Sequence, residues 1–271
     1  MSVNMVISKD VIAKRNSLAR DIATVQDILH EFFPLANIGS LNSAISTLKN
    51  GKPILCPYQE IAPSFWGYKV SKLIFRLDGG VPRKMKPTGA VDLKLIVNIH
   101  VVGNCDYLGT MEDPLLWLAI DFKIEGDILK NDEVVKVFTC YHLDRHIVKK
   151  GDGETEPHPF YHFQYGGRHL VNADGGLDTG DLIVIETPRI THHPLDLILG
   201  LDYLISYFFP EKRKEIIRKS REYSLLLRKY QEIILKPYFH TLASCWNYDH
   251  QSIVSTNPLW TPISICPQIV S

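Results

Sequence analysis

The sequence predicts an α+β fold in which an antiparallel β-meander is flanked by an N-terminal helical pair and a C-terminal helix pair. Apolar residues recur at helical spacing near both ends of the chain, alternate with polar residues through the middle, and are joined there by short links. Short links favour antiparallel pairing, because parallel neighbours need long crossover connections. The C-terminal helices are then expected to cover the apolar face of the sheet.

Two helices are predicted at the start of the chain, at 9–33 and 40–49. In the first, apolar residues return every three or four positions, and Ser8 or Ser17 is suited to cap its start. A proline marks its end. The second helix is followed by Gly51, a residue type favoured just past a helix C-terminus.

The middle of the chain predicts four consecutive strands, because apolar and polar residues alternate as they do in a half-buried sheet. The segments are VSKLIFRL, VDLKLIVNIHVV, LLWLAIDFKIE and EVVKVFTCYHLDRHIV. Two further strand candidates, FYHFQYG and DLIVIETP, come after a glycine- and acid-rich segment that is expected to be an exposed loop.

The C-terminal part predicts two more helices. Pro194 suits the first turn of a helix that reaches Phe209, with Thr191 as its cap. This helix is apolar nearly all round, which is typical of a helix buried on most sides. The second is a single long helix at 211–235. After Trp246 the chain is punctuated by prolines and is expected to be irregular.

This order of elements is interpreted as one α+β domain over residues 1–271. Its sections are the N-terminal helices at 1–50, the sheet at 66–190, the C-terminal helices at 191–246 and an irregular tail at 247–271.

Composition argues against several classes of protein. Hydrophobic residues make up 45% of the chain and charged residues 22%, which are ordinary values for a folded globular protein. The 30 basic and 30 acidic residues cancel, so no overall field attracts nucleic acid or a membrane. The pattern of a signal peptide and a bilayer-spanning stretch are both missing, and the five scattered cysteines suit reduced thiols. We expect a soluble cytoplasmic protein.

Histidine is crowded into one part of the chain. Seven of the eleven histidines fall between Cys140 and His193. Imidazole changes charge near neutral pH and is the commonest metal ligand in proteins, so this crowding is the best indication of a functional site.

Register arguments place some of these histidines beside an acid. A tight turn near Lys130 and Asn131 brings Asp121 opposite His142, and a similar register in the preceding hairpin brings His100 beside Asp121. The expected result is a His–Asp–His row across three neighbouring strands, in which the carboxylate orients imidazoles for acid–base chemistry or metal binding. The alternative is a solvated sheet face with cross-strand salt pairs.

The complete set of candidate catalytic residues is His100, Asp121, His142, Asp144 and His162. The H-x-x-x-H spacings at 142–146 and 158–162 do not define a metal motif, because residues four apart on a strand lie about 13 Å from each other. A divalent metal is the cofactor considered, and its identity stays open.

Two further segments are candidates for binding. Gly166 and Gly167, followed by Arg168 and His169, offer backbone amides and a guanidinium to an anion, although Gly-Gly is also a hairpin-turn signal.

The second binding candidate is the basic start of the long C-terminal helix at 211–221. Arg213, Lys214 and Arg218 are the candidate contacts to a nucleic-acid or acidic protein partner. The alternative is a solvated helix face with pairing between Glu and Lys four residues apart.

The function expected from these residues is hydrolysis of phosphodiester or related bonds, by His/Asp acid–base or metal-assisted chemistry. One alternative is a non-catalytic binding module that docks a macromolecular partner through its basic helix or its His- and aromatic-rich loop. Another is a small-ligand receptor with a pocket lined by Tyr161, Phe163 and Tyr165. The sequence leaves open whether the protein is an enzyme.

Overall fold

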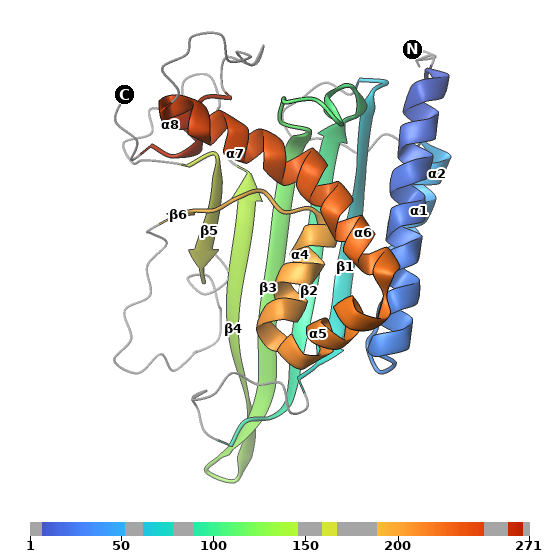
Figure 1. The fold of residues 1–271 in the computed structure, drawn as a ribbon. Helices are drawn as coiled ribbons and strands as arrows, with labels where there is room; N and C mark the ends of the chain where they lie inside the picture. Colours follow the sequence, from blue (N-terminus) through green and yellow to red (C-terminus); the bar gives the residue numbers. More distant parts are fainter. Residues whose placement is uncertain are drawn as a thin grey trace, which may run out of the picture.

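The computed structural model describes residues 7–51, 62–77, 89–145, 159–166, 189–246 and 260–267. One antiparallel sheet is covered on one face by the C-terminal helices, and two N-terminal helices stand beside its first strand (Figure 1). The predicted α+β fold with an antiparallel meander is confirmed. Within the ranges given, no helix has both the length and the apolar composition that a membrane span requires.

Within the described residues, six strands pair in chain order, and every pairing is antiparallel. The strands are β1 Phe65–Arg76, β2 Val91–Asn104, β3 Leu115–Lys130, β4 Glu133–Arg145, β5 Tyr161–Tyr165 and β6 Ile190–Thr191. The first five overlap segments that the sequence predicts as strands, but β1 begins five residues earlier and β3 ends five residues later than predicted. The strand predicted at 181–188 lies outside the described residues.

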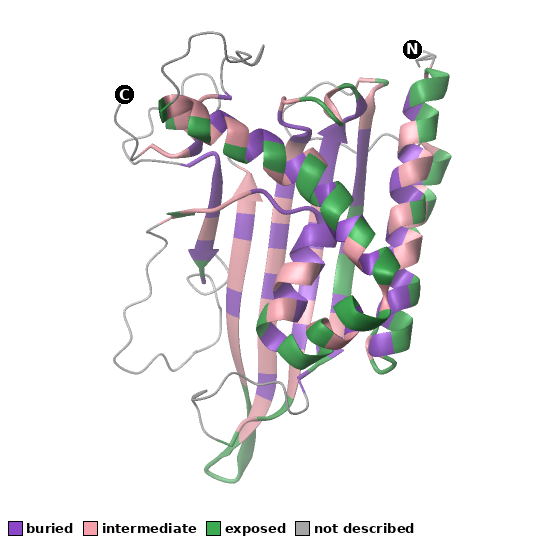
Figure 2. Cartoon of the chain, viewed as in Figure 1, coloured by how far each residue is buried: buried purple, intermediate pink, exposed green. Residues whose placement is uncertain are grey.

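A two-residue turn, Asn131 and Asp132, joins β3 to β4. Both residues have a positive φ, of 52° and 63°, which is the signature of the type I′ turn that matches the twist of a hairpin. This turn lies one residue beyond the predicted position and confirms the predicted pairing of Asp121 with His142. The tip of the hairpin is exposed to solvent (Figure 2).

The core fills the space between the apolar face of the sheet and the helices. On β2, the residues of this face are all buried: Leu95, Val97, Ile99 and Val101. The helix α4 (Leu197–Phe208) lies so close to β3 that a Cβ on Gly200 would be 3.1 Å from Ile120 Cδ1. Phe122 meets Phe208 edge to face, with ring centroids 6.3 Å apart. Small and aromatic side chains therefore set the distance between α4 and the sheet.

The N-terminal helices α1 (Lys9–Phe32) and α2 (Leu41–Asn50) begin and end close to their predicted limits. Ser8 caps α1, and its side chain accepts a hydrogen bond from the backbone of Val11. Gly51 ends α2 with a φ of 60°, the left-handed conformation that glycine adopts most easily.

Basic side chains attach α1 to the first strand and to the start of the β2–β3 connection. The guanidinium of Arg15 donates to the backbone carbonyls of Pro63 and Phe65. Lys14 Nζ donates to the carbonyl of Cys105 over 3.1 Å. These bonds satisfy carbonyls near the edge of the sheet and fix where α1 lies against it.

The C-terminal part is a series of short helical segments. After α4 come α5 (Pro210–Lys219), α6 (Arg221–Tyr230), a π turn (Gln231–Leu235), α7 (Lys236–Ala243), a 3₁₀ turn (Ser244–Trp246) and α8 (Pro262–Ile265). The predicted helical character of this section is confirmed, but its boundaries differ from the prediction. The single turn of α8 falls in the segment that was expected to be irregular.

The start of α4 was predicted wrongly. Thr191 belongs to β6, and Pro194 precedes the helix. The cap is Asp196, whose carboxylate accepts a hydrogen bond from the backbone N–H of Leu199 at 3.0 Å. Aspartate is a stronger cap than threonine, and its charge suits the positive end of the helix.

The single helix predicted at 211–235 is also wrong, because the chain breaks at Ser220. Ser220 is extended, with φ −112° and ψ 98°, and its hydroxyl caps α6 by accepting from Tyr223 N. An ion pair holds the corner: Arg213 donates through Nε and Nη2 to Asp202 of α4, at 2.8 and 2.9 Å. The Tyr223 hydroxyl donates to the same carboxylate at 3.1 Å, so α4, α5 and α6 meet at one partly buried ion pair.

The helical path does not end at Leu235, where the sequence predicts the end of the long helix, although a proline follows. Pro237 lies in the first turn of α7, directly after the π turn. In an α-helix its ring would collide with the carbonyl of Ile233, and its missing N–H would leave that carbonyl without a donor. The wider turn relieves this conflict and lets the helical path continue to Ala243.

Buried Asp196 makes the stability of the fold depend on pH. Burial raises the pKa of Asp196 to about 7, although the backbone N–H groups at the start of α4 oppose the rise. In the unfolded chain the carboxyl ionises near pH 4, so the unfolded state loses its proton first as pH rises. Unfolding free energy should therefore fall between about pH 4 and pH 7 and level off above.

Asp196→Asn should remove this dependence, because asparagine still caps the helix but does not ionise. We expect the unfolding free energy of the variant, relative to that of the wild type, to rise by up to about 4 kcal/mol between pH 4 and pH 7. Urea unfolding monitored by circular dichroism measures it. Glu222→Gln, on the exposed surface of α6, controls for the loss of a negative charge. A stability difference that is the same at both pH values would contradict the prediction.

Candidate metal centre

The polar face of the sheet is turned away from the helices α4 to α7. Residues that pair across neighbouring strands share a face, so the registers arrange the polar side chains in rows. One row is Lys69, His100, Ala119, Asp144, His162 and Thr191, and the next row is Asn98, Asp121, His142 and Gln164. All five predicted catalytic residues lie in these two rows: Asp121, His142, Asp144 and His162 on β3 to β5, and His100 on β2.

Three of them converge at the β4–β5 end. His142 Nε2 lies 3.4 Å from Asp144 Oδ2, and one ligand atom from each of His142, Asp144 and His162 lies within 4.8 Å of the other two. The two imidazole rings meet nearly at right angles, with centroids 6.3 Å apart. His162 is buried, whereas 37% of the Asp144 side chain is exposed. The cluster therefore meets solvent on the Asp144 side.

Strand geometry explains this convergence. His142 and Asp144 are two residues apart on β4, so their side chains leave the same face about 6.6–6.8 Å from each other. His162 of β5 pairs directly with Asp144. Three side chains at adjacent positions of one sheet face can reach a common point, which residues four apart on one strand cannot.

Further polar residues flank the cluster. Asp121 pairs with His142 from β3, and Gln164 pairs with it from β5. Ala119 pairs with Asp144 and places only a methyl group beside the carboxylate. The cluster therefore has a second carboxylate on one side, a carboxamide on the other and the least bulky neighbour next to Asp144.

The predicted pairing of His100 with Asp121 is wrong. His100 pairs with Ala119, and Asp121 pairs with Asn98, so the register differs by two residues from the prediction. A shift of two keeps His100 on the same face but moves it one row away. The connection from β2 to β3 is longer than a tight turn and contains a 3₁₀ turn and a register shift next to Gly103, which set the register.

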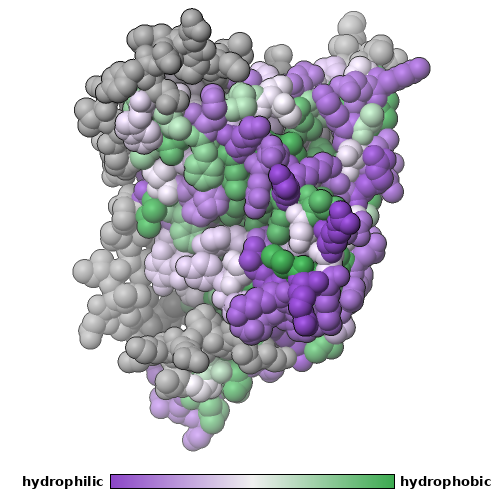
Figure 3. All heavy atoms as spheres, viewed as in Figure 1, coloured by the Kyte–Doolittle hydropathy of each residue, from purple (hydrophilic) through white to green (hydrophobic). Residues whose placement is uncertain are grey.

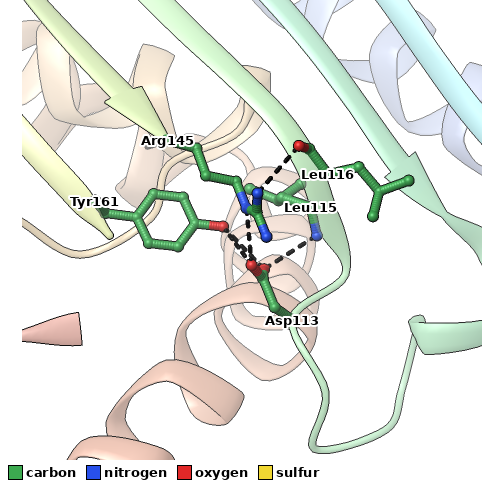
Figure 4. A network of polar contacts seen from close by, with 5 residues as sticks. All are labelled: Asp113, Leu115, Leu116, Arg145 and Tyr161. Atoms are coloured by element: carbon green, nitrogen blue, oxygen red, sulfur yellow. Dashed lines mark hydrogen bonds and ion pairs between the residues drawn. The ribbon is translucent and has the colours of Figure 1, made fainter. Parts of the chain in front are cut away.

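A buried polar network lies directly behind the cluster (Figure 4). Asp113, just before β3, receives the Arg145 Nε–H at 3.0 Å and the Tyr161 hydroxyl at 2.8 Å. Asp113 Oδ1 also accepts from the backbone N–H of Leu115, while Arg145 Nη1 donates to the carbonyl of Leu116 at 3.1 Å. Arg145 follows Asp144, and Tyr161 precedes His162, so the network fixes the backbone on both sides of the cluster.

Burial and charge act against each other in this network. Burial raises the pKa of Asp113, and the Arg145 guanidinium, together with the hydrogen bonds from Leu115 and Tyr161, opposes the rise. Burial would lower the pKa of Arg145, but the Asp113 carboxylate outweighs it and the pKa is raised. The pair is satisfied by several hydrogen bonds, as a buried ion pair must be if it is to be tolerated.

The donor set is suited to a divalent transition metal. Imidazole nitrogen and carboxylate oxygen are the ligands of catalytic zinc and of non-haem iron sites, whereas calcium and magnesium favour oxygen alone. Without a metal, Asp144 and His142 form an acid–base pair in which the carboxylate orients the imidazole, and His162 lies beside them.

The anion-binding segment predicted at Arg168 and His169 lies outside the described residues. The same is true of His146 and His158, so the structure gives no position for their side chains.

His192 and His193 lie on the other side of β5 from the cluster. Their rings stack with centroids 4.1 Å apart, and His192 contacts Phe163, which faces the helices. Burial lowers the pKa of His193 to about 4, helped by the neighbouring His192. Both residues are followed by the segment that leads to the cap of α4, and neither faces His162.

The basic helix start is largely engaged in ion pairs. Arg213 is bound to Asp202, and Lys214 pairs with Glu211 at 2.7 Å. Glu215 pairs with Lys212 and with Lys219. Hydrophilic side chains gather over this corner of the molecule (Figure 3), but the acids among them offset much of the positive charge. Arg218 is exposed on α5.

Sequence reasoning missed Gln164 and the network around Asp113. Gln164 carries no chemical signal by itself, since glutamine occurs at many solvated strand positions. Asp113 and Arg145 are 32 residues apart, and only the register of β3, β4 and β5 brings them together. The one available indication was that Arg145 has apolar residues, Leu143 and Ile147, two positions away on either side, where a strand places neighbours on the same face.

Comparison with known proteins adds no functional information: no protein-family model, no curated protein and no solved structure matches the chain.

Removing one partner of the buried network should be strongly destabilising. In Asp113→Ala the Arg145 charge stays buried without its carboxylate, which typically lowers stability by about 3–5 kcal/mol. Glu211→Ala, which breaks an exposed ion pair with Lys214, should change it by less than about 0.5 kcal/mol. Urea unfolding of both variants measures the difference, and a loss of under 1 kcal/mol for Asp113→Ala would show that the network does not anchor the strands.

Proposed function

We propose that the protein is a metal-assisted hydrolase of phosphodiester or related bonds, and that His142, Asp144 and His162 hold a divalent metal. The proposal rests on the convergence of two imidazoles and one carboxylate within 4.8 Å. Sites with three protein ligands leave a coordination position for water or substrate, which is typical of catalytic zinc.

The three residues fit a metal without a change of backbone. With bonds of about 2.0–2.2 Å, two ligand atoms of a tetrahedral zinc ion lie about 3.4 Å apart. His142 Nε2 and Asp144 Oδ2 already have that separation. His162, whose ligand atom lies within 4.8 Å of the other two, would complete the set by a movement of its side chain, because its backbone pairs directly with that of Asp144.

Hydrolysis of a phosphodiester needs a base for water and a proton for the leaving group. The water oxygen bonds to phosphorus, one bridging P–O bond breaks, and the departing oxygen takes a proton while the water loses one. A divalent metal lowers the pKa of water and offsets charge on the phosphoryl oxygens. Asp121, beside His142 in the register, is the carboxylate placed to accept a proton.

His100 has a different part in this proposal. Burial lowers its pKa, and the nearby Lys69 adds to the effect. The imidazole is therefore neutral at neutral pH and is suited to accept or donate one hydrogen bond, not to supply a proton as a charged acid.

Lysines on the same face support an anionic substrate. Lys69 pairs with His100, Lys94 pairs with Glu125, and Lys123 pairs with Cys140. Lys123 is held by an ion pair with Glu125 at 3.0 Å, whereas Lys69 lies in the same row as Asp144 and His162 and favours the approach of a phosphate to this face.

The buried thiols of Cys105 and Cys140 are free, and on that basis we place the protein in the cytoplasm, where thiols stay reduced. The alternative function, a non-catalytic module that docks a partner through α5, has less support, because Arg213 and Lys214 are held by Asp202 and Glu211.

The test is metal binding. Metal-free protein titrated with Zn²⁺ by calorimetry should bind one equivalent, and His142→Ala or His162→Ala should weaken binding at least about a hundredfold, because each removes a direct ligand. His30→Ala, on the exposed side of α1, removes an imidazole elsewhere and should leave binding unchanged.

Activity provides the second measurement. The zinc-loaded wild type should hydrolyse bis(4-nitrophenyl) phosphate, and removal of the metal by a chelator should abolish the reaction until zinc is restored. Stoichiometric zinc that persists in the double variant His142→Ala/His162→Ala would contradict the assignment of the ligands. A wild type that binds no divalent metal would contradict the proposal as a whole.

A further inference from the structure

Gln164, beside the cluster, has an amide donor that lacks a hydrogen-bond partner among the described residues. Gln164 is only 3% exposed. Its Nε2 is buried and makes no hydrogen bond within the part of the chain that the structure describes. Most buried side-chain donors in proteins are paired, so an unpaired carboxamide in such a position calls for an explanation.

The position of Gln164 relates it to the proposed metal ligands. It pairs across the strands with His142 and lies two residues after His162 on β5. Its side chain therefore leaves the same face as both imidazoles, with its Cβ about 4.5–5.5 Å from that of His142.

The next polar group along this face beyond Gln164, the thiol of Cys140, already has a hydrogen-bond partner. Cys140 lies two residues before His142 on the same face of β4, and its Sγ donates to the carbonyl of Gly166 at 3.3 Å. The thiol and this carbonyl close the end of the row. The described residues supply no acceptor for Gln164 Nε2, and a molecule bound at the cluster would supply one.

The chemistry of a carboxamide donor limits which bound molecule can accept its hydrogen bond. A carboxamide N–H is a neutral donor, so it can lie beside a divalent cation without repelling it, as a lysine or arginine would. Its natural acceptor is an oxygen that carries negative charge, and such hydrogen bonds are stronger than those between neutral groups. Donors placed in this way next to a reacting centre stabilise developing charge on oxygen.

We infer that Gln164 Nε2 donates to a non-bridging oxygen of a phosphate group bound at the His142–Asp144–His162 centre. The inference rests on the proposed function and adds a specificity residue to it. Gln164 then selects a substrate with a phosphoryl oxygen at that point, and the donor stays unpaired until the substrate binds.

The experiment uses the full-length protein loaded with Zn²⁺ and titrated with orthophosphate. Gln164→Met keeps the length and shape of the side chain but removes the donor. We expect orthophosphate binding to weaken about tenfold, while Zn²⁺ affinity changes less than about threefold. The melting temperature should not fall, because the lost donor had no partner in the protein.

A buried glutamine with a partner is the matched control. Gln26 of α1 donates through Nε2 to Asn42 Oδ1 at 3.2 Å. Gln26→Met should lower the melting temperature and leave orthophosphate binding unchanged. Gln164→Glu, which keeps the shape and adds a negative charge, should weaken orthophosphate binding more than Gln164→Met does, and provides the same test if the methionine variant does not fold.

The outcomes separate this inference from the proposed function. Normal zinc binding with unchanged orthophosphate binding in both Gln164 variants would overturn the inference alone. A fall in melting temperature for Gln164→Met as large as that for Gln26→Met would also overturn it, because Gln164 would then have a structural partner. A wild type that binds no zinc overturns both.

Discussion

The geometry of the candidate metal centre depends on the buried ion pair between Asp113 and Arg145, with Tyr161 as its third member. These residues lie just before β3, at the end of β4 and at the start of β5, and Arg145 and Tyr161 both donate hydrogen bonds to the Asp113 carboxylate. Arg145 and Tyr161 pair across the strands on the helix-facing side. Their chain neighbours Asp144 and His162 pair on the polar side. One network on one face therefore fixes two residues of the candidate centre on the opposite face.

The same network explains why the strands do not slip. A shift of one residue between β4 and β5 would move Asp144 or His162 into the core and expose Arg145 or Tyr161, and the buried Asp113 would lose its partners. Arg145 also donates to the carbonyl of Leu116, the residue that β3 inserts where its register with β2 shifts. A buried ion pair adds little to stability compared with an apolar core, but here every alternative register leaves a charge unpaired. Specificity of pairing is the role that the geometry supports.

The sequence predicted what depends on local pattern and missed what depends on distant contacts. Alternation along β2, β3 and β4 gave the correct faces, and the short β3–β4 turn gave the correct pairing of Asp121 with His142. The pairing of His100 could not be obtained in the same way, because the β2–β3 connection has a 3₁₀ turn and a register shift. Ser220 and Pro237 show the same limit in the helices. The Arg213–Asp202 anchor and the π turn decide where those helices break, and neither follows from periodicity.

Metal-ligand spacing along a sequence has a different meaning in a sheet than in a helix. On a helix, ligands four residues apart lie one above the other, so H-x-x-x-H is informative. On a strand, the useful spacing is two, and it supplies only two neighbours. A third ligand has to come from the adjacent strand at a separation that the connecting loop determines, and His162 has that position relative to His142 and Asp144. A short H-x-D on the polar side of a predicted strand, followed by a histidine on the polar side of the next strand, is therefore a stronger indication of a centre of this kind than either H-x-x-x-H spacing. The same reasoning applies to Gln164, because it is the residue of β5 that pairs with His142.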